Sequence, residues 1–238
     1  MDVALSSEPW LNTPVSESTV MGPSGPAISY LTTRDGTDGS VSKYWGFVFP
    51  VSPTATPYVG SLKCVGYDIR TFGDPVLASV ADEVENIDGK LVRLSQSMLQ
   101  AMYKAPGLGL AAPQIGVQKK IFVYDIDGEP ITLINPRIVE SSGEWVYDEG
   151  CLSIPGLYVE MLRPKQVLLE ALDLNGNEIK IEADELLARL FQHELDHLNG
   201  VLMFDRMTED QRREALVEYR KLSDGDLPRG ETRHIALK

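Results

Sequence analysis

The chain has 238 residues, of which 43% are hydrophobic and 24% are charged, and its formal net charge is −13. These proportions are typical of a globular protein, whereas the acidity argues against nucleic-acid binding, which needs a basic surface. No apolar run approaches the roughly 18 residues of a transmembrane helix. We therefore expect a globular protein without nucleic-acid sequence readout and without a membrane-spanning segment.

Residues 1–66 differ in composition from the rest of the chain. They are rich in Ser, Thr, Pro and Gly, and show no sustained helical or strand period apart from the short run KYWGFVF. We expect a poorly ordered extension, either a targeting segment or the product of a wrongly assigned start codon. The first residues, MDVALSSEPW, lack the basic and apolar regions of a secretory signal. With only Cys64 and Cys151 available, we expect no disulfide framework and a reducing compartment.

The compact domain is expected to span residues 67–238. Residues 71–79 are expected to be extended, with a turn at Gly73–Pro75. Apolar residues at 91, 94, 98 and 102 share one helical face and predict a helix over 88–105. GLGLAAPQIG at 107–116 is expected to form a loop. Alternating or continuous apolar runs predict strands at 119–127, 131–140 and 144–150, and 165–183 predicts a hairpin that turns at Asn175–Gly176.

The last third of the chain predicts two helices. The first covers 184–200 and ends at Asn199–Gly200; VLMFDR at 201–206 is expected to be extended. The second, at 208–222, is charged and amphipathic, with Thr208 as its N-cap. Together these elements predict an α+β fold, in which antiparallel or mixed β-sheets pack around the central helix 184–200, with helices before and after it.

The central helix carries the sequence HELDH. Leu186, Leu190, His193 and His197 lie on one face, so both histidines should point inward. Imidazoles at i and i+4 can bind one metal ion, and Glu194 beside the first can act as a general base towards water. The alternative is a pair of hydrogen-bonded core histidines, which would leave Glu194 near the core without a role.

A catalytic metal site needs a third protein ligand. Met203 stands where one metalloprotease class has a third histidine. Another class uses a downstream glutamate, and the candidates here are Glu209, Glu214 and Glu218 on the polar helix. Cys151, in DEGCLSIPG, is the remaining candidate; as an alternative it is a small buried hydrophobe. Cys64 and His234 are weaker candidates.

The segment GLGLAAPQ contains small residues that let a ligand or another backbone approach closely. A dinucleotide-binding loop is disfavoured, because the segment follows a helix and Pro113 interrupts the next one. The segment could instead form a substrate-binding wall that ends in Gln114, whose amide can donate to an oxyanion. A tight turn packed on a helix is the plainer alternative.

GLGLAAPQ, EGCLS and HELDH occur in this order, and the combination resembles the peptide deformylase family. The resemblance runs from about Tyr67 to about Met207, and the segment around HELDHLNGVLMFDRM is most similar to the bacterial and organellar type 1 branch. It implies a mononuclear divalent metal held by Cys151, His193 and His197. Fe(II) is favoured, although Zn, Ni or Co also suit a thiolate ligand.

The resemblance also implies the activity and the remaining roles. The activity is hydrolysis of the N-formyl group from nascent formyl-methionyl peptides, which releases formate. Glu194 would be the general base, and the side chain of Gln114 and the backbone N–H of Leu152 would bind the oxyanion. The pocket for the methionine side chain would be bordered by Leu108, Gly109, Leu152 and Leu190.

Further expectations concern the surroundings of the site. By family position Arg163 could pair with Asp196 and hold the central helix against EGCLS. Tyr158 stands where some members carry a peptide-binding arginine. The partners would be nascent formyl-Met peptides at the ribosome exit, with no membrane partner. The compartment would be a plastid or mitochondrion in a eukaryote, or the cytoplasm of a bacterium.

Three rival functions make different predictions. A general metallopeptidase would take its third ligand from a glutamate or histidine rather than from Cys151. A non-catalytic binding protein would be expected to lack Glu194 or a metal ligand, and this chain has them all. An oxidoreductase that used the glycine-rich loop would be stabilised by nucleotide.

Overall fold

A computed structural model describes residues 16–20, 28–32, 66–126, 128–224 and 232–237. Contacts divide the chain into two units, Met1–Gly60 and Ser61–Lys238. The first contains an antiparallel strand pair, β1 (Ser16–Val20) and β2 (Ile28–Thr32), which was not predicted from the sequence. Most of the extension expected at 1–66 lies outside the described residues.

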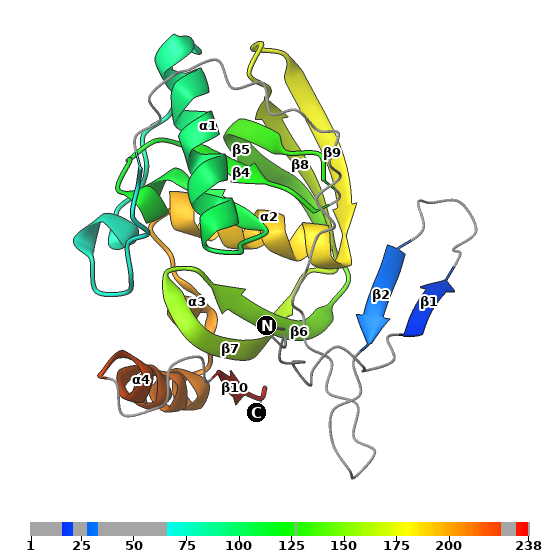
Figure 1. Ribbon diagram of the computed structural model, residues 1–238, viewed down its shortest axis with the longest axis vertical. Helices are drawn as coiled ribbons and strands as arrows, with labels where there is room; N and C mark the ends of the chain where they lie inside the picture. Colours follow the sequence, from blue (N-terminus) through cyan, green and yellow to red (C-terminus); the bar gives the residue numbers. More distant parts are fainter. Residues whose placement is uncertain (1–15, 21–27, 33–65, 127, 225–231, 238) are drawn as a thin grey trace, which may run out of the picture. The chain divides into compact units, whose positions relative to one another are not determined.

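The second unit is built on a five-stranded antiparallel sheet (Figure 1). Its strand order is β3-β4-β5-β8-β9, and consecutive neighbours pair antiparallel. The strands are β3 (Gly109–Ala111), β4 (Ile121–Tyr124), β5 (Ile131–Ser142), β8 (Gln166–Leu172) and β9 (Glu178–Asp184). As expected, β8 and β9 form a hairpin, and Gly176 supplies the positive φ of +83° in its turn.

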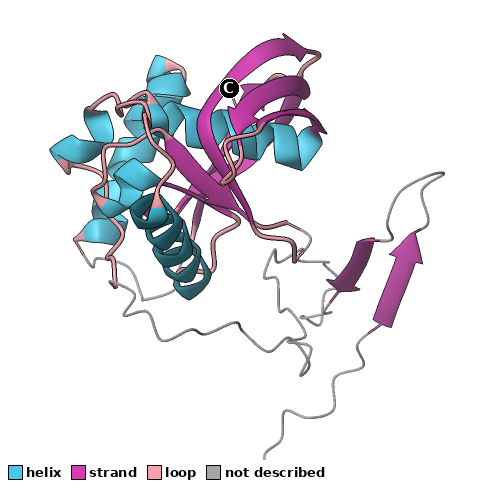
Figure 2. Ribbon diagram, turned by 90° about the horizontal axis from the view of Figure 1, so that it is seen from above, coloured by secondary structure: helices cyan, strands magenta, loops and turns pink. Residues whose placement is uncertain are grey.

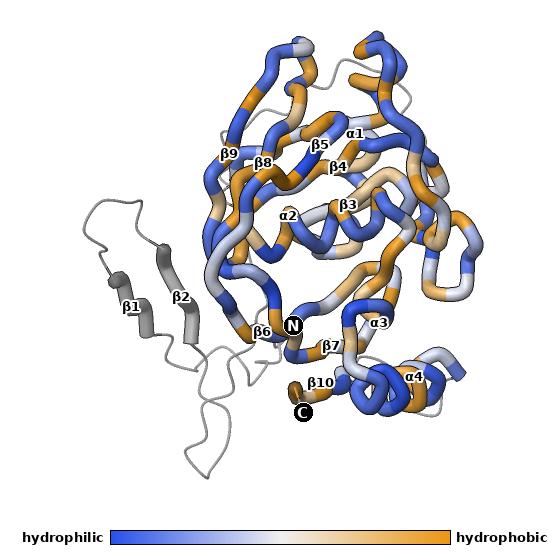
Figure 3. Tube along the Cα trace, turned by 180° about the vertical axis from the view of Figure 1, so that it is seen from behind, coloured by the Kyte–Doolittle hydropathy of each residue, from blue (hydrophilic) through white to orange (hydrophobic). Residues whose placement is uncertain are grey.

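Two helices cover opposite faces of this sheet. In β4, Phe122 packs in the cluster of α2 (Glu185–Leu198), whereas Ile121 and Val123 pack in the cluster of α1 (Gly89–Lys104). Successive strand residues point to opposite faces, so β4 is buried on both sides. Its residues are mostly coloured hydrophobic in Figure 3, whereas α4 (Glu209–Ser223) is largely hydrophilic.

A second sheet has the order β10-β7-β6. Strands β6 (Trp145–Cys151) and β7 (Ile154–Arg163) form an antiparallel hairpin, and β10 (Arg233–Ile235) joins β7 in parallel. A third apolar cluster joins this sheet to α4, with Leu157, Val159, Phe204 and Tyr219 among its members. Helix α2 lies between the five-stranded sheet and the β6–β7 hairpin (Figures 1 and 3). The fold is therefore α+β, as predicted, and Figure 2 shows its helices and strands from above.

Several local predictions need correction. Residues 201–206, expected to be extended, include the short helix α3 (Met203–Arg206), because Asp205 caps it by accepting from the Leu202 N–H at 3.0 Å and because Phe204 is buried. The loop expected at 107–116 contains β3, which pairs with β4, and a 3₁₀ turn at Ala112–Ile115. A second 3₁₀ turn, Pro75–Ala78, directly follows the turn expected at Gly73–Pro75, in a segment otherwise expected to be extended.

Strand β7 was also not predicted. Its second residue is Pro155, and a proline without an N–H is tolerated near the beginning of a strand. Helices α1 and α2 were predicted correctly, and so was Thr208 as the N-cap of α4. None of the helices in the described part of the chain is long and apolar enough to cross a membrane.

Candidate metal centre

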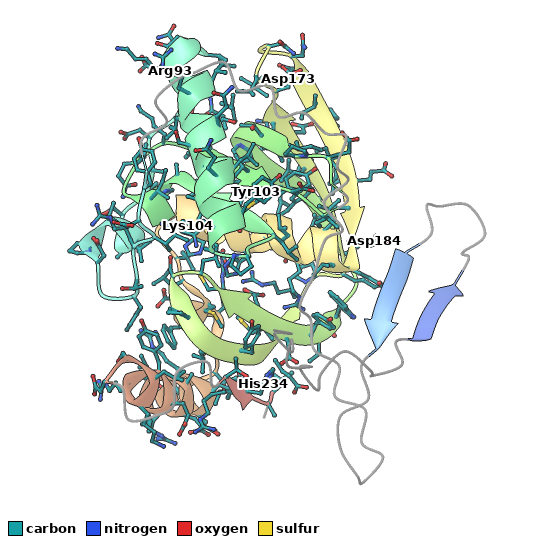
Figure 4. The ribbon with its side chains drawn as sticks, in the orientation of Figure 1. Arg93, Tyr103, Lys104, Asp173, Asp184 and His234 are labelled. Carbon is teal, nitrogen blue, oxygen red and sulfur yellow. The ribbon has the colours of Figure 1, made fainter. Side chains whose placement is uncertain are left out.

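Cys151, His193 and His197 converge between α2 and the β6–β7 hairpin. Their candidate ligand atoms all lie within 4.8 Å of one another, and no other such cluster occurs among the described residues. Sγ of Cys151 is 3.2 Å from Nε2 of His197, and both side chains are buried. The third histidine, His234, stands apart on β10, where it stacks on Tyr158 with ring centroids 5.1 Å apart (Figure 4).

A buried carboxylate orients the first histidine. Nδ1 of His193 lies 2.7 Å from Oε1 of Glu149, so a proton shared there leaves Nε2 available as a ligand atom. Burial alone would raise the pKa of Glu149, but His193 and Arg163 lower it overall, so this residue stays a carboxylate. Glu149 lies in the EGCLS segment but had no predicted role.

The electrostatics of the two imidazoles fit a bound cation. Burial lowers the pKa of His193, but the charges of Cys151 and Glu149 outweigh it and raise this pKa well above its ordinary value. Burial and the charge of His193 hold the pKa of His197 well below its ordinary value. The cluster therefore attracts one positive charge while keeping one imidazole neutral. Thiolate and two imidazoles are also a donor set that suits a transition metal.

Glu194 is buried beside this cluster. Its Oε2 has no hydrogen-bond partner among the described residues, and only 3% of the residue is exposed. Burial raises its pKa to about 7. A carboxyl group with such a pKa can take up and release a proton near neutral pH.

The amide of Gln114 has a defined orientation. Its Oε1 accepts from the backbone N–H of Ala111 at 2.8 Å, so its NH₂ group points the other way. Nε2 lies 3.3 Å from Oγ of Ser153 and 3.8 Å from Sγ of Cys151. Gln114 thus presents a buried donor to the cluster. Ser153, at the end of EGCLS, was not predicted to take part.

Two of the residues expected to border the substrate pocket lie on β3 and α2, and the other two lie in the turns before β3 and after β6. Gly109 is on β3, and a Cβ atom there would be 2.5 Å from Oε1 of Glu194. Leu108 packs against the apolar cluster that contains Leu190 of α2. Leu152 follows Cys151, and its side chain would meet a Cβ atom at Gly107.

The expected pair of Arg163 and Asp196 is present and buried. Nη1 of Arg163 lies 3.0 Å from Oδ2 of Asp196, and the same guanidinium donates twice to Glu149 at 2.7 Å. Arg206 also donates to Asp196. Arg163 therefore joins α2 to the strand that ends in Cys151.

The positions that could supply a third metal ligand in other metalloprotease classes lie away from the cluster. Met203 is 2% exposed and packs in the apolar cluster with Phe204. Among the described residues, the only potential metal-binding group that contains the two histidines of α2 is completed by Cys151, and the glutamates of α4 are not part of it.

An HExxH helix whose two histidines meet a buried cysteine is the arrangement of a metal-dependent hydrolase. Residues 67–213 match the family model described as polypeptide deformylase. The chain is 50% identical over 142 residues to a peptide deformylase of Clostridium botulinum, covering 60% of this chain and 97% of the relative. The chain belongs to the polypeptide deformylase family.

Solved structures of peptide deformylases have the same fold as this chain. The crystal structure of a peptide deformylase from Legionella pneumophila has a TM-score of 0.65 and 40% identity, and covers 68% of this chain and 98% of that one. A peptide deformylase from Synechococcus elongatus, solved in complex with actinonin, has a TM-score of 0.62 and 41% identity, with 71% and 91% covered. The family and the α+β class predicted from the sequence are thus confirmed.

Proposed function

We propose that this chain removes the N-formyl group from the N-terminal formylmethionine of newly synthesised proteins and releases formate. One observation carries the proposal: Cys151 lies beside the two histidines of HELDH and a buried Glu194. The chain is also a member of the deformylase family. Hydrolysis of a formamide at neutral pH needs an activated water and a proton carrier, and these residues can provide for both.

Cys151, His193 and His197 would hold one divalent cation. When bound, such a cation supplies Lewis acidity, which makes water a nucleophile near pH 7 and polarises a carbonyl. We favour Fe(II), although Zn, Ni or Co suit the same donors. Glu149 would keep His193 in the tautomer that offers Nε2.

Glu194 would act as the general base and later as the general acid. Its carboxylate accepts a proton from the attacking water, and passes it to the amine nitrogen as the carbon–nitrogen bond breaks. Burial raises the pKa of this carboxyl group, which opposes the lowering that a bound cation would cause and so favours both proton transfers.

The developing negative charge on the formyl oxygen would be bound by two donors, Nε2 of Gln114 and the backbone N–H of Leu152. Since Gln114 is already turned by its bond to Ala111, it needs no reorientation during the reaction. Leu108, Gly109 and Leu190 would border an apolar pocket for the methionine side chain.

The substrates would be nascent chains, met near the ribosome exit. We assign the deformylase domain to residues 67–238, including α4, and treat 1–66 as an extension. We propose a plastid or mitochondrion as the compartment in a eukaryote, and the cytoplasm in a bacterium.

The test is formate release from formyl-Met-Ala by anaerobically purified protein, with metal content measured on the same sample. We expect turnover with one metal per chain, and loss of both in Cys151→Ala. Metal without formate release would refute the deformylase activity and favour a peptidase or a binding protein. A Cys151→Ala variant that keeps its metal would refute the ligand assignment.

A further inference from the structure

Arg189 lies on α2, one helical turn before His193, and is 3% exposed. Its Nη1 donates to Oε2 of Glu149 at 3.0 Å. Its Nη2 donates to two backbone carbonyls, of Trp145 at 2.8 Å and of Met161 at 3.0 Å. A single guanidinium therefore joins α2 to both strands of the β6–β7 hairpin.

Arg189 completes the set of donors around Glu149. His193 and Nη2 of Arg163 both contact Oε1 at 2.7 Å. Nε of Arg163 and Nη1 of Arg189 contact Oε2, at 2.7 and 3.0 Å. Because Arg189 and Arg163 approach the carboxylate from different elements, together they restrict its rotation. The oxygen that faces His193 is thereby held in place.

An aromatic ring confines the other side of the guanidinium. Cζ of Arg189 lies 5.1 Å from the centre of the Trp145 ring, which stacks on Tyr147 at 4.5 Å and an interplanar angle of 11°. Such a position favours a cation over the ring face. The guanidinium is thus fixed by three acceptors and one aromatic wall.

Burial of the Arg189 guanidinium costs desolvation free energy that packing alone does not explain. Its Nε is buried without a partner among the described residues, and buried charged networks are often no more stable than apolar replacements. What an apolar residue could not do is hold the carboxylate that orients His193.

We infer that Arg189 is a positioning residue for the metal centre, which acts through Glu149 to keep Nε2 of His193 directed at the cation. The inference rests on the proposed function, because it takes His193 as a ligand. It predicts that metal retention, rather than folding, is the property most sensitive to Arg189.

The test uses the full chain loaded with Co(II). Arg189→Met keeps the length of the aliphatic stem but removes the donors, and we expect it to release metal to a chelator about 10- to 100-fold faster than the unmodified protein. The Co(II) visible spectrum should change as well, since the ligand field reports the orientation of His193. The control is Arg206→Met, which removes another arginine from the same ionic network, at Asp196 rather than at Glu149. It should leave release rate and spectrum within about two-fold of the unmodified values.

A double-mutant cycle with Glu149→Gln separates positioning from general support of the hairpin. If Arg189 acts through Glu149, the effects of the two substitutions on metal release are non-additive. Additive effects, or an Arg189→Met protein that retains metal as well as Arg206→Met does, would overturn the inference. Should Arg189→Met not fold, Arg189→Lys replaces it in the cycle, since it keeps the charge but loses the fork of donors. If the unmodified protein binds no Co(II), the proposed function fails instead.

Discussion

The backbone of Gly109 lies directly against the carboxylate of Glu194. A Cβ atom at position 109 would be 2.5 Å from Oε1 and 3.1 Å from Cδ of Glu194. The glycine on β3 thus leaves the space into which α2 projects its buried acid. Glycine at this place in GLGLAAPQ is explained by contact with Glu194, in addition to any approach by substrate.

Gly109→Ala should therefore displace Glu194 and slow the reaction. We expect kcat to fall by about 10²-fold or more, because positioned general bases contribute roughly 10² to 10⁴. Metal content should stay near that of the unmodified protein. The control is Gly89→Ala, where the new methyl group meets only the Arg93 side chain at 3.4 Å. A Gly109→Ala enzyme with near-normal kcat would show that Glu194 tolerates displacement.

Glu194→Gln should remove turnover while the metal remains bound. The glutamine has the same shape but cannot accept and return a proton, so activity should drop by at least about 10²-fold. The three candidate ligands are untouched by the change. Formate release and metal content, measured together, check this; retention of more than a few per cent of activity would rule out the general-base role.

The same substitution should stabilise the metal-free protein at high pH. Burial raises the pKa of Glu194 from 4.5 to about 7, so the folded state binds its proton more tightly than the unfolded state does. The resulting stabilisation is present below about pH 4.5 and is lost as the pH rises through 7, by about 3 kcal/mol or less. Glutamine at position 194 is neutral at every pH, so the variant does not lose folding stability in this way as the pH rises.

The advantage of Glu194→Gln over the unmodified protein should thus grow between pH 4.5 and pH 8. Urea unfolding at several pH values, in the presence of a chelator, measures it. A difference in unfolding free energy that is constant with pH would mean that Glu194 does not titrate with a raised pKa in the folded protein.

Local spacing explains which parts of the site were predictable. His193 and His197 lie four residues apart on one helix, so their convergence follows from helical geometry alone. Cys151 is separated from His197 by 46 residues and comes from another element. Its place beside the histidines depends on how the β6–β7 hairpin packs on α2, which spacing does not fix. Exclusion of the other possible ligands made Cys151 a candidate, and the resemblance to a family then implied it as the third ligand.

The residues that were missed are those that act on other side chains. Glu149 was quoted within EGCLS but given no role, although it is buried and shares the face of β6 that carries Trp145, Tyr147 and Cys151. Arg189 precedes His193 by four residues, so it shares the inward helical face. A charged residue on the inward face indicates a buried ion pair or hydrogen-bond network. Its partners cannot be predicted from the sequence, because they depend on tertiary packing.

Among the glycines that the structure describes, Gly200 should be the one whose substitution destabilises the fold most. Its φ is +68°, and a Cβ atom there would lie 2.8 to 2.9 Å from backbone atoms of Ala78 and Ser79. Backbone cannot move aside as a side chain can, so Gly200→Ala combines left-handed strain with a steric clash. We expect a loss of at least about 2 kcal/mol in unfolding free energy.

Gly176→Ala separates these two contributions. Its φ of +83° is similar, but the nearest atom to a new Cβ is Cδ1 of Ile87, at an ordinary 3.8 Å. This variant should lose only the strain of a left-handed non-glycine residue, about 1 kcal/mol. Equal losses in the two variants would contradict the clash. A larger loss in Gly200→Ala would show that the end of α2 is fixed by direct backbone contact with the segment before α1, which also accounts for the glycine in HLNG.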